Sequence, residues 1–309
     1  MKRISSQRGR EKIKTGGMVR SKTVGGYISD FVLVFIIAVC AAICIIPMWH
    51  ILMLSVSDGR TIYTFDGIAM LPQGGVTFAA YLELFSTMDG ILWRGYLNTV
   101  IYVVGTLAFG LIINVVAGYC LSRKTKLRGF MSVLCIFSVM FSGGQAPLYF
   151  VVNTLGLTNT YFSVILTECT MGMYMLYGAI AFRSVPHETV EAAELDGSGH
   201  IRVMFQIMLP QCLSIFMVTL LMTFVSSWNS YISAQLYNTR NSDIHPLQLV
   251  LLTLKEEVDG WMNSSADPPY ASYPVQFAGI VMATLPIMIA MPFFQDKLEA
   301  GVIGGAVKG

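Results

Sequence analysis

The sequence predicts an all-α membrane protein with six transmembrane helices, and three observations support this fold class. Of its 309 residues, 54% are hydrophobic and only 12% are charged, about half the charged share of a soluble domain. Six apolar stretches are long enough, or nearly so, to cross the hydrocarbon layer, which takes about 20 helical residues. The basic residues gather in every second connection between these stretches. The bilayer, rather than water, is therefore the main solvent of this chain.

The apolar stretches are expected to be helices, because lipid offers no partner to a backbone N–H or C=O group. They lie at about 31–56, 97–121, 127–152, 161–182, 207–234 and 275–294. The first is too long for the apolar region of a signal peptide, and no small-residue cleavage site follows it. The third is interrupted at residues 142–147 (SGGQAP). Such a break is stable only against protein or a wet cavity.

The basic residues also predict the orientation of the chain. Most of them lie before the first stretch, after the second, after the fourth and after the last. The others are Arg60, Arg94, Arg240 and Lys255. Because cytoplasmic connections are enriched in lysine and arginine, both termini are predicted to be cytoplasmic. The net charge of +2 is too small to indicate nucleic-acid binding.

Three parts of the chain follow from this topology. Residues 1–26 form a basic cytoplasmic tail, residues 27–295 form the six-helix membrane domain, and residues 296–309 form a cytoplasmic C-terminal tail. The membrane domain includes a cytoplasmic connection at 183–210. On the other side, the connections 57–92 and 236–274 are long and rich in turn residues. Long connections usually carry function, so we expect a partner to dock on the extracytoplasmic side.

No residue pattern in the sequence indicates catalysis. The six cysteines fall in or beside apolar stretches at no metal-ligand spacing, and we interpret them as small buried hydrophobic residues. The four histidines are scattered over different parts of the predicted topology. The Gly-x-x-x-x-Gly-Lys-Ser/Thr phosphate loop is not found. The chain is therefore not expected to be an enzyme, to hold a metal or a cofactor, or to hydrolyse ATP itself.

The connection 183–210 is predicted to be a helix–turn–helix outside the bilayer. Its helix begins near Pro186, a residue suited to a first helical turn. Three acidic residues follow along one face: Glu188, Glu191 and Glu194. Two small residues offer a flat surface to an approaching protein: Ala192 and Ala193. Two glycines permit a left-handed turn, Gly197 and Gly199, and a second short helix leads to Leu209 and Pro210.

This pattern resembles the EAA loop of ABC importer permeases: Glu-Ala-Ala, three residues, Gly, nine residues and Ile-x-Leu-Pro. In that family the loop is the coupling helix, which sits in a cleft of the ATP-binding subunit. The resemblance therefore implies a role in ATPase coupling for Glu191, Ala192, Ala193, Asp196, Gly197 and Pro210. The alternative is an amphipathic helix lying on the membrane surface, but its apolar side is thin and its glycines are misplaced.

Other segments resemble the carbohydrate branch of these permeases. Residues 294–309 look like the closing segment of sugar permeases of the MalG type, although 295–299 are more acidic than usual. Residues 141–144 and 155–160 are similar to the LplC/YtcP branch, which is linked to complex oligosaccharides. Trp228 and Asn229 also fit the sugar-permease pattern. The resemblance implies a type I ABC importer permease fold and a subunit of an ATP-driven, binding-protein-dependent importer of a carbohydrate, such as an oligosaccharide.

The same resemblance implies the partners and the location. The chain would form half of a translocation pathway with a second homologous permease in the bacterial cytoplasmic (inner) membrane. Two copies of an ABC ATPase would bind ATP and Mg, and an extracytoplasmic sugar-binding lipoprotein would deliver the solute. Two alternatives stay open: an ABC importer of another solute, such as a peptide or a polyamine, and a membrane scaffold or sensor without transport.

Polar residues inside spans are costly, so they are functional hypotheses by default. Sugars bind to aromatic faces and to planar amides or carboxylates, which predicts a substrate pathway lined by Gln145, Asn153, Glu168, Trp228, Asn229 and Tyr231. Hydrogen bonding between helices is the alternative role of such residues. Apart from Arg128 at the start of the third stretch, no basic residue lies within a span, so Glu168 is expected to meet water, sugar hydroxyls or the second permease. Arg94 is its nearest candidate partner within the chain.

Overall fold

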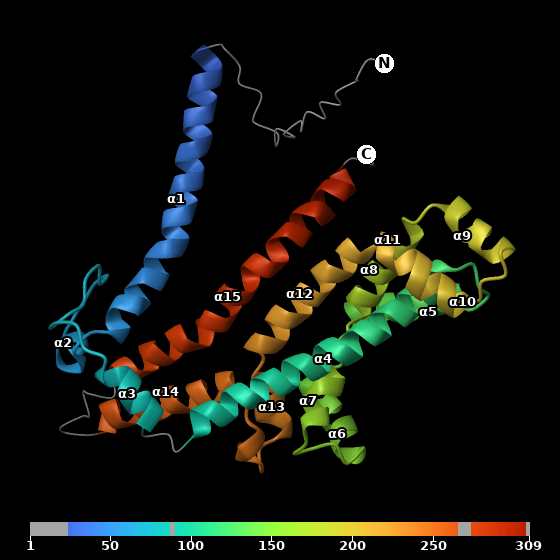
Figure 1. Ribbon diagram of the computed structural model, residues 1–309. Coiled ribbons are helices and arrows are strands. Elements are labelled where there is room, and N and C mark those ends of the chain that lie inside the picture. The colour runs from blue at the N-terminus through green and yellow to red at the C-terminus, as the bar shows by residue number, and fades with distance from the viewer. Residues whose placement is uncertain (1–23, 87–89, 265–272, 307–309) are drawn as a thin grey trace, which may run out of the picture. The chain divides into compact units, whose positions relative to one another are not determined.

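The computed structural model describes residues 24–86, 90–264 and 273–306, in which every regular element is a helix (Figure 1). Contacts divide the chain into two units, one ending at His50 and one beginning at Ile51. The first unit holds most of α1 (Val24–Ser55), a 32-residue helix. Most of the predicted tail 1–26 lies outside the described residues. The predicted first span is confirmed as a helix that is long and apolar enough to cross a membrane.

The second unit is built around α4 (Ile91–Ser122), which runs through it as a long straight helix (Figure 1). It packs against α7 (Tyr161–Glu168), α8 (Gly172–Arg183), α12 (Leu213–Asn229) and α14 (Leu247–Ser264). The buried face of α4 is formed largely by small and polar residues at helical spacing, among them Gly95, Asn98, Tyr102, Thr106, Gly110, Asn114 and Gly118. Small and polar residues at helix contacts are typical of proteins whose outer surface meets lipid.

The closest approach of α4 to a neighbour is its crossing with α8. A Cβ atom on Gly118 would lie 2.7 Å from the carbonyl carbon of Gly178, and a Cβ on Gly178 would lie 2.8 Å from the backbone oxygen of Asn114. No side chain larger than hydrogen fits at either position without separating the helices. The two glycines therefore bring the backbones of α4 and α8 into direct contact.

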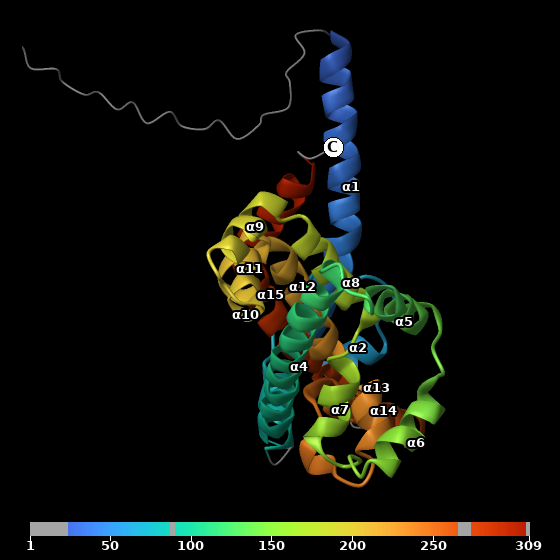
Figure 2. The same cartoon turned by 90° about the vertical axis from the view of Figure 1, so that its right-hand side faces the viewer.

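Three helix pairs of the second unit are bent. The pair α5 (Arg128–Met140) and α6 (Gln145–Thr154) turns by 119°, and the pair α7 and α8 turns by 48°. The segment His200–Gln211 turns by 83° into α12. Within the described residues, three helices are long and apolar enough to span a membrane, and up to six spans result if each bent pair counts as one. The predicted fold class is confirmed, and the interruption predicted at 142–147 is the turn between α5 and α6 (Figure 2).

Several connections contain short helices. The connection after α1 holds α2 (Gly59–Tyr63) and α3 (Ala79–Ser86). The fifth predicted stretch ends earlier than expected, because α12 stops at Asn229 and a separate α13 (Ile232–Tyr237) follows. The region expected to be a loop at 236–274 contains the 18-residue helix α14, whose apolar residues at 247, 250, 254 and 258 are buried at helical spacing. The last helix, α15 (Tyr273–Ala306), runs unbroken past position 296.

The two largest apolar cores of the second unit lie toward opposite ends of α4. Leu92 and Val103 pack with α3, α14 and α15 near the start of α4, whereas Val115 and Tyr119 pack with α8 and the 190–216 region near its end. Cys135, Cys169 and Cys212 are buried as expected, but Cys40, Cys44 and Cys120 are exposed. That expectation was wrong for these three, because apolar side chains on membrane helices can also face lipid.

Candidate functional site

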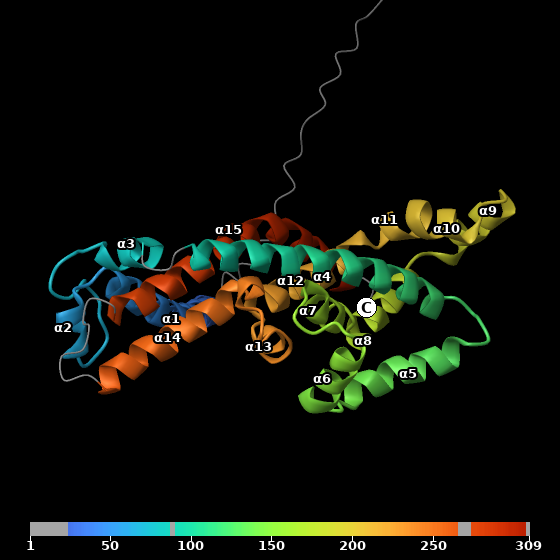
Figure 3. The same ribbon diagram turned by 90° about the horizontal axis from the view of Figure 1, so that it is seen from below.

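The segment that resembles the EAA loop forms α9 (His187–Leu195), followed by a turn at Gly197 and by α10 (His200–Arg202) (Figure 3). Pro186 occupies the N-cap position, as the sequence predicts for the start of this helix. Gly197 has φ of +79°, so the predicted left-handed turn is confirmed at this residue. Gly199 has φ of −70° and does not take part in it.

The two alanines of the segment face opposite ways. Ala193 and Val190 are buried against Val203 and other core residues of this end of the unit, whereas Ala192 is exposed. The expected flat surface is therefore not formed by both alanines, because one turn of helix sends neighbouring residues to different faces. Glu191 and Asp196 are exposed with Ala192. These three candidate coupling residues share the surface of α9 that other proteins can reach.

Two large apolar residues flank the glycine turn in full exposure. The side chains of Leu195 and Ile201 are 88% and 74% exposed, although both belong to apolar residue types that are mostly buried in soluble proteins. Exposed apolar groups gathered at one place mark a surface for a partner or for lipid.

An ion pair ties α9 to the end of α4. The guanidinium of Arg123, the residue after α4, donates to the carboxylate of Glu194. It also lies over the ring of Tyr119, 5.7 Å from the centroid, and the Tyr119 hydroxyl is 3.3 Å from Nδ1 of His200. Sequence reasoning placed Arg123 only as a topological charge. Its pairing could not be found, because 71 residues separate the partners.

A π-helix at Val203–Met208 and the short α11 (Leu209–Gln211) connect α10 to α12. Pro210 is exposed in α11, where the chain turns by 83° toward α12. Proline lacks a backbone N–H and interrupts the helical hydrogen bonds. The residue sits at the bend that separates the loop from the long helix.

Glu168 lies where two helix breaks meet. It is the last residue of α7, at the bend before α8, and its side chain is half-buried. The hydroxyl of Ser230, in the gap between α12 and α13, donates to this carboxylate. Among the described residues, no basic side chain pairs with Glu168. Arg94, its nearest candidate partner from the sequence, instead forms an ion pair of 3.0 Å with Asp243.

Tyrosines surround this part of the unit. Tyr102 and Tyr237 are buried, and their neighbours in the same cluster are only partly buried: Tyr149, Tyr161 and Tyr231. Their rings pack in pairs, with centroids 5.3 Å apart for Tyr102 and Tyr161 and 6.4 Å apart for Tyr149 and Tyr237. A tyrosine combines an aromatic face with a hydroxyl tip. Of this group, sequence reasoning named only Tyr231 as a pathway residue.

The other predicted pathway residues are dispersed. Trp228 is buried, and its indole N–H donates to the backbone oxygen of Ala283 at 3.1 Å, which gives it a packing role between α12 and α15. Asn229 is exposed and donates to Val225 of its own helix. Gln145 and Asn153 lie on α6, both exposed. The structure thus brings Glu168 close to Ser230 but does not gather all six candidates in one place.

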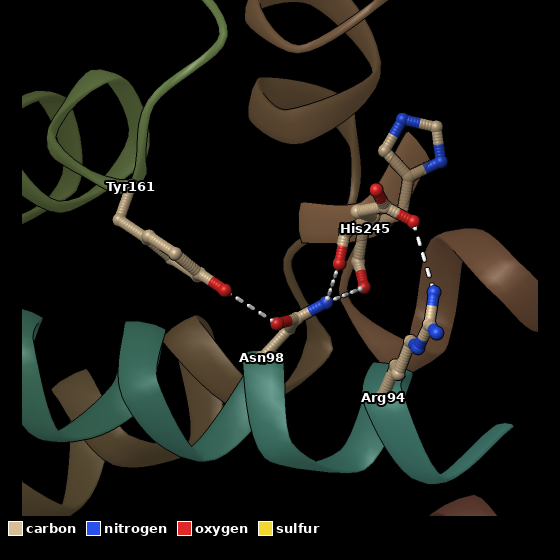
Figure 4. A network of polar contacts seen from close by, with 5 residues as sticks. Arg94, Asn98, Tyr161 and His245 are labelled. Carbon is tan, nitrogen blue, oxygen red and sulfur yellow. Dashed lines mark hydrogen bonds and ion pairs between the residues drawn. The ribbon is translucent and has the colours of Figure 1, made fainter. Parts of the chain in front are cut away.

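A polar network holds the connection between α13 and α14 against the start of α4 (Figure 4). The amide of Asn98 donates to the backbone oxygens of Asp243 and His245 at 2.8 and 2.9 Å, and it accepts from the Tyr161 hydroxyl at 2.7 Å. The Tyr102 hydroxyl donates to the backbone oxygen of Ile244 at 2.9 Å. Residues of α4 and α7 therefore fix this segment.

The same connection is held from its other end by Asn238. This residue is fully buried, and its side chain accepts from Ser163 and donates to Tyr102, both at 3.0 Å. A buried amide whose oxygen and nitrogen both have partners gives a precise position to its segment. Sequence reasoning missed Asn98 and Asn238, because their partners lie between 63 and 147 residues away along the chain. Within the described residues, no cluster of three or more His, Cys, Asp or Glu could hold a metal ion.

Comparisons with known proteins agree with these features. Residues 106–304 match the family model described as "Binding-protein-dependent transport system inner membrane component". The chain is 30% identical over 279 residues to the polygalacturonan/rhamnogalacturonan transport system permease protein YtcP of Bacillus subtilis (strain 168), covering 87% of this chain and 94% of that protein. It is 35% identical over 239 residues to Protein LplC of the same organism, covering 75% and 79%.

The fold has a counterpart among solved structures. A chain in the crystal structure of a bacterial ABC transporter involved in the import of the acidic polysaccharide alginate superposes with a TM-score of 0.77. The match covers 89% of this chain and 98% of that one at 23% identity, so it concerns the fold alone. The family model covers well over half of the chain, including α9. The chain belongs to the binding-protein-dependent transport system inner membrane components, the non-catalytic permease subunits of ABC transporters.

Proposed function

We propose that this chain forms half of the translocation pathway of an ATP-driven, binding-protein-dependent importer of a carbohydrate. The observation that carries the proposal is the placement of α9. This helix extends beyond the end of α4, exposes Glu191, Ala192 and Asp196, and is fastened to α4 through Arg123 and Glu194 (Figure 3). A helix that is exposed on one face and fixed on the other is suited to pass the movement of a bound partner into the membrane domain.

The partner at α9 is an ABC ATPase. The exposed Leu195 and Ile201 offer apolar area for contact, and the left-handed turn at Gly197 sets the angle between α9 and α10. Buried apolar area is the main favourable term in protein association. Pro210 then marks the point where the movement reaches α12.

The complete assembly contains a second homologous permease, two ATPase copies and an external binding protein. Membership of a binding-protein-dependent family requires a delivering protein and an ATPase, and the sequence has no phosphate loop of its own. Both termini and the 183–210 segment lie in the cytoplasm, as the distribution of lysine and arginine indicates. The segment 238–245, fixed by Asn98 and Asn238, lies on the outer side, where the binding protein docks.

Glu168 marks the pathway within the membrane. A carboxylate at this depth is expensive to bury without partners, and the hydroxyls of Ser230 and Ser233 are hydrogen-bonded to it. Sugar hydroxyls are suited to donate further hydrogen bonds to this carboxylate. Tyr231, which follows Ser230 in the sequence and is partly exposed, offers an aromatic ring face. Three exposed amides that lie apart from Glu168 are proposed as further pathway residues: Gln145, Asn153 and Asn229.

The solute is a carbohydrate, in particular an oligosaccharide. Three relatives that match this chain are named for the transport of polygalacturonan/rhamnogalacturonan, of diacetylchitobiose and of arabinooligosaccharides. The tyrosine cluster beside Glu168 has the mixed aromatic and hydroxyl character that sugars require.

The coupling role is tested with Glu191→Lys and Gly197→Pro in proteoliposomes that hold the full assembly. The first reverses a charge on the exposed face, and the second replaces a residue at positive φ with one whose φ is locked near −65°. We expect uptake to fall at least tenfold in both variants while membrane insertion stays normal. Glu256→Lys, an exposed acidic residue on α14, is the matched control and should transport as the wild type does.

Pull-down of the ATPase and ATP hydrolysis are measured beside uptake. Loss of ATPase binding, or hydrolysis without uptake, supports coupling through α9. Normal uptake in both variants would show that this segment is not the coupling element. If the assembly with its native binding protein carries a peptide or a polyamine but no sugar, the carbohydrate assignment is wrong and the permease assignment stands.

A further inference from the structure

A pocket of about 930 Å³ lies between the end of α4, the start of α5 and the inner face of α9. Basic side chains from two connections line it: Arg123, Lys124, Lys126, Arg128 and Arg183. The acidic residues in its wall are Glu191 and Glu194, and the second is already paired with Arg123. The wall therefore carries more positive than negative charge. The basic side chains that remain unpaired have no role in the proposed coupling to the ATPase.

The surplus cations are available to a ligand. In the described part of the chain, no carboxylate forms an ion pair with Lys124, Lys126 or Arg128. Arg183 is held in place by donating to the backbone oxygen of Leu121 at 2.9 Å. Four cationic groups that face one pocket from two chain segments match a polyvalent oxygen anion such as a phosphate group.

Much of the rest of the wall is apolar, beside the polar side chains of Ser122, Thr125, His187 and His200. Phe182, Val185 and Val190 form a buried floor, and Leu127 and Met131 line the side formed by α5. On α5, only Cys135 is buried, and the outward residues are large and apolar, among them Phe130, Val133, Leu134 and Phe137. A soluble phosphate compound would gain nothing from this wall, whereas a lipid could place its headgroup among the cations and its chains along α5.

From this arrangement, we propose that the pocket binds an anionic phospholipid of the cytoplasmic leaflet, with its phosphate held by Lys124, Lys126, Arg128 and Arg183. Basic pockets between membrane helices on the cytoplasmic side suit such headgroups. The inference uses the proposed orientation but not the carbohydrate or the coupling assignment. The lipid fills the space between α5 and α9 and so supports α9 from the face opposite Ala192.

The ATPase is the other conceivable occupant of this charged surface. Of the exposed coupling residues, only Glu191 lines the pocket, whereas Ala192, Leu195 and Asp196 do not. The face of α9 proposed for the ATPase is thus largely separate from the face that closes the pocket.

The test compares the assembled importer in nanodiscs of dioleoyl phosphatidylglycerol and of dioleoyl phosphatidylcholine. Lipids retained after release are counted by native mass spectrometry. The variant Lys124→Gln/Lys126→Gln/Arg128→Gln removes three cations from the pocket. The control Arg60→Gln/Arg240→Gln/Lys255→Gln removes three cations that do not line the pocket, so the net charge changes equally.

We expect the wild type and the control to retain phosphatidylglycerol in preference to phosphatidylcholine. In the pocket variant the apparent affinity should fall by about two orders of magnitude, because each basic group near a membrane surface strengthens anionic-lipid binding by about fivefold. Equal retention by the pocket variant and the wild type, or no preference for phosphatidylglycerol, overturns the proposal.

Two further arms identify the occupant. Displacement of the bound lipid by inorganic phosphate alone would show a soluble-anion site and overturn the lipid assignment. A phosphatidylglycerol with a photoreactive headgroup is also cross-linked to the wild type, so the test stands even if the variant does not fold. Attachment within residues 123–131 supports the proposal. Cross-links found only outside these residues contradict it. The proposal is also contradicted if the bound ATPase, but not the lipid, protects Lys124 and Lys126 from an acetylating reagent.

Discussion

Glu168 illustrates how a single residue acquires its role from the backbone around it. Glu168 ends α7 at a bend, and the hydroxyl that meets its carboxylate comes from Ser230 at a second break. Broken helices expose backbone groups that must find partners in protein or in a wet cavity. The sequence predicted that this carboxylate would need donors, because no basic residue other than Arg128, at the start of the third stretch, lies in a span. It could not predict Ser230, which is 62 residues away.

The charge of Glu168 is expected to matter more than its shape. Glu168→Gln keeps the volume but replaces a charged acceptor with an amide, and hydrogen bonds to charged groups contribute about 1.5–3 kcal/mol. We expect sugar uptake to fall by about one to two orders of magnitude, with assembly and basal ATP hydrolysis retained. Ser230→Ala, which removes one donor and leaves the charge, should reduce uptake much less.

Uptake, ATP hydrolysis and the yield of the assembled complex separate the possible outcomes. Loss of assembly in Glu168→Gln would make the residue structural, and unchanged uptake would exclude it from the pathway.

Among the helices, α4 shows best how the elements contact one another. Its buried face is small and polar and its outer face is apolar, the arrangement expected where lipid replaces water around the protein. Hydropathy therefore located α4 and most spans. Hydropathy could not resolve the bends within the three bent helix pairs, because the two helices of each pair have a similar apolar composition. It also missed α14, where the spacing of Leu247, Val250, Leu254 and Val258 was the available signal.

The crossing of α4 and α8 predicts a large effect of one added side chain. Gly118→Val would place a Cβ 2.7 Å from the backbone of Gly178 and should destabilise the protein by about 3 kcal/mol, since overpacking that separates helices is costly. Gly129→Val is the matched control, because no atom lies within 4 Å of a Cβ built there.

Thermal melting of the detergent-solubilised complex gives the comparison. Melting temperatures that fall equally in both variants would indicate that the β-branched residue, rather than the helix contact, causes the loss.

Across the whole molecule, the second unit divides its tasks between the two ends of α4. At one end, Arg123 forms the ion pair that fastens α9. At the other end, Asn98 forms the hydrogen bonds that fasten the segment 238–245. The motif at 191–210 predicted the first region, since local spacing was sufficient. The second depends on amide contacts to backbone oxygens that are 145 and 147 residues away. No local pattern encodes such contacts.

The hold on the outer segment predicts a local change in hydrogen exchange. Asn98→Leu should speed amide exchange at residues 243–247 by about one to two orders of magnitude, because buried hydrogen bonds of about 1 kcal/mol each are lost. The same substitution at Asn229, whose amide bonds only within its own helix, should leave this segment unchanged. Unaltered exchange in Asn98→Leu would show that Asn238 and Tyr102 hold the segment without it.

The contact between Gly118 and Gly178 also limits how these two positions can change together in evolution. At most tight contacts, a larger residue on one side is compensated by a smaller one on the other. Here both sides already lack a side chain, so no second-site substitution at either position can restore the fit. A genetic screen for suppressors of Gly118→Val should therefore return changes elsewhere along α4 and α8, at positions that let the two helices move apart.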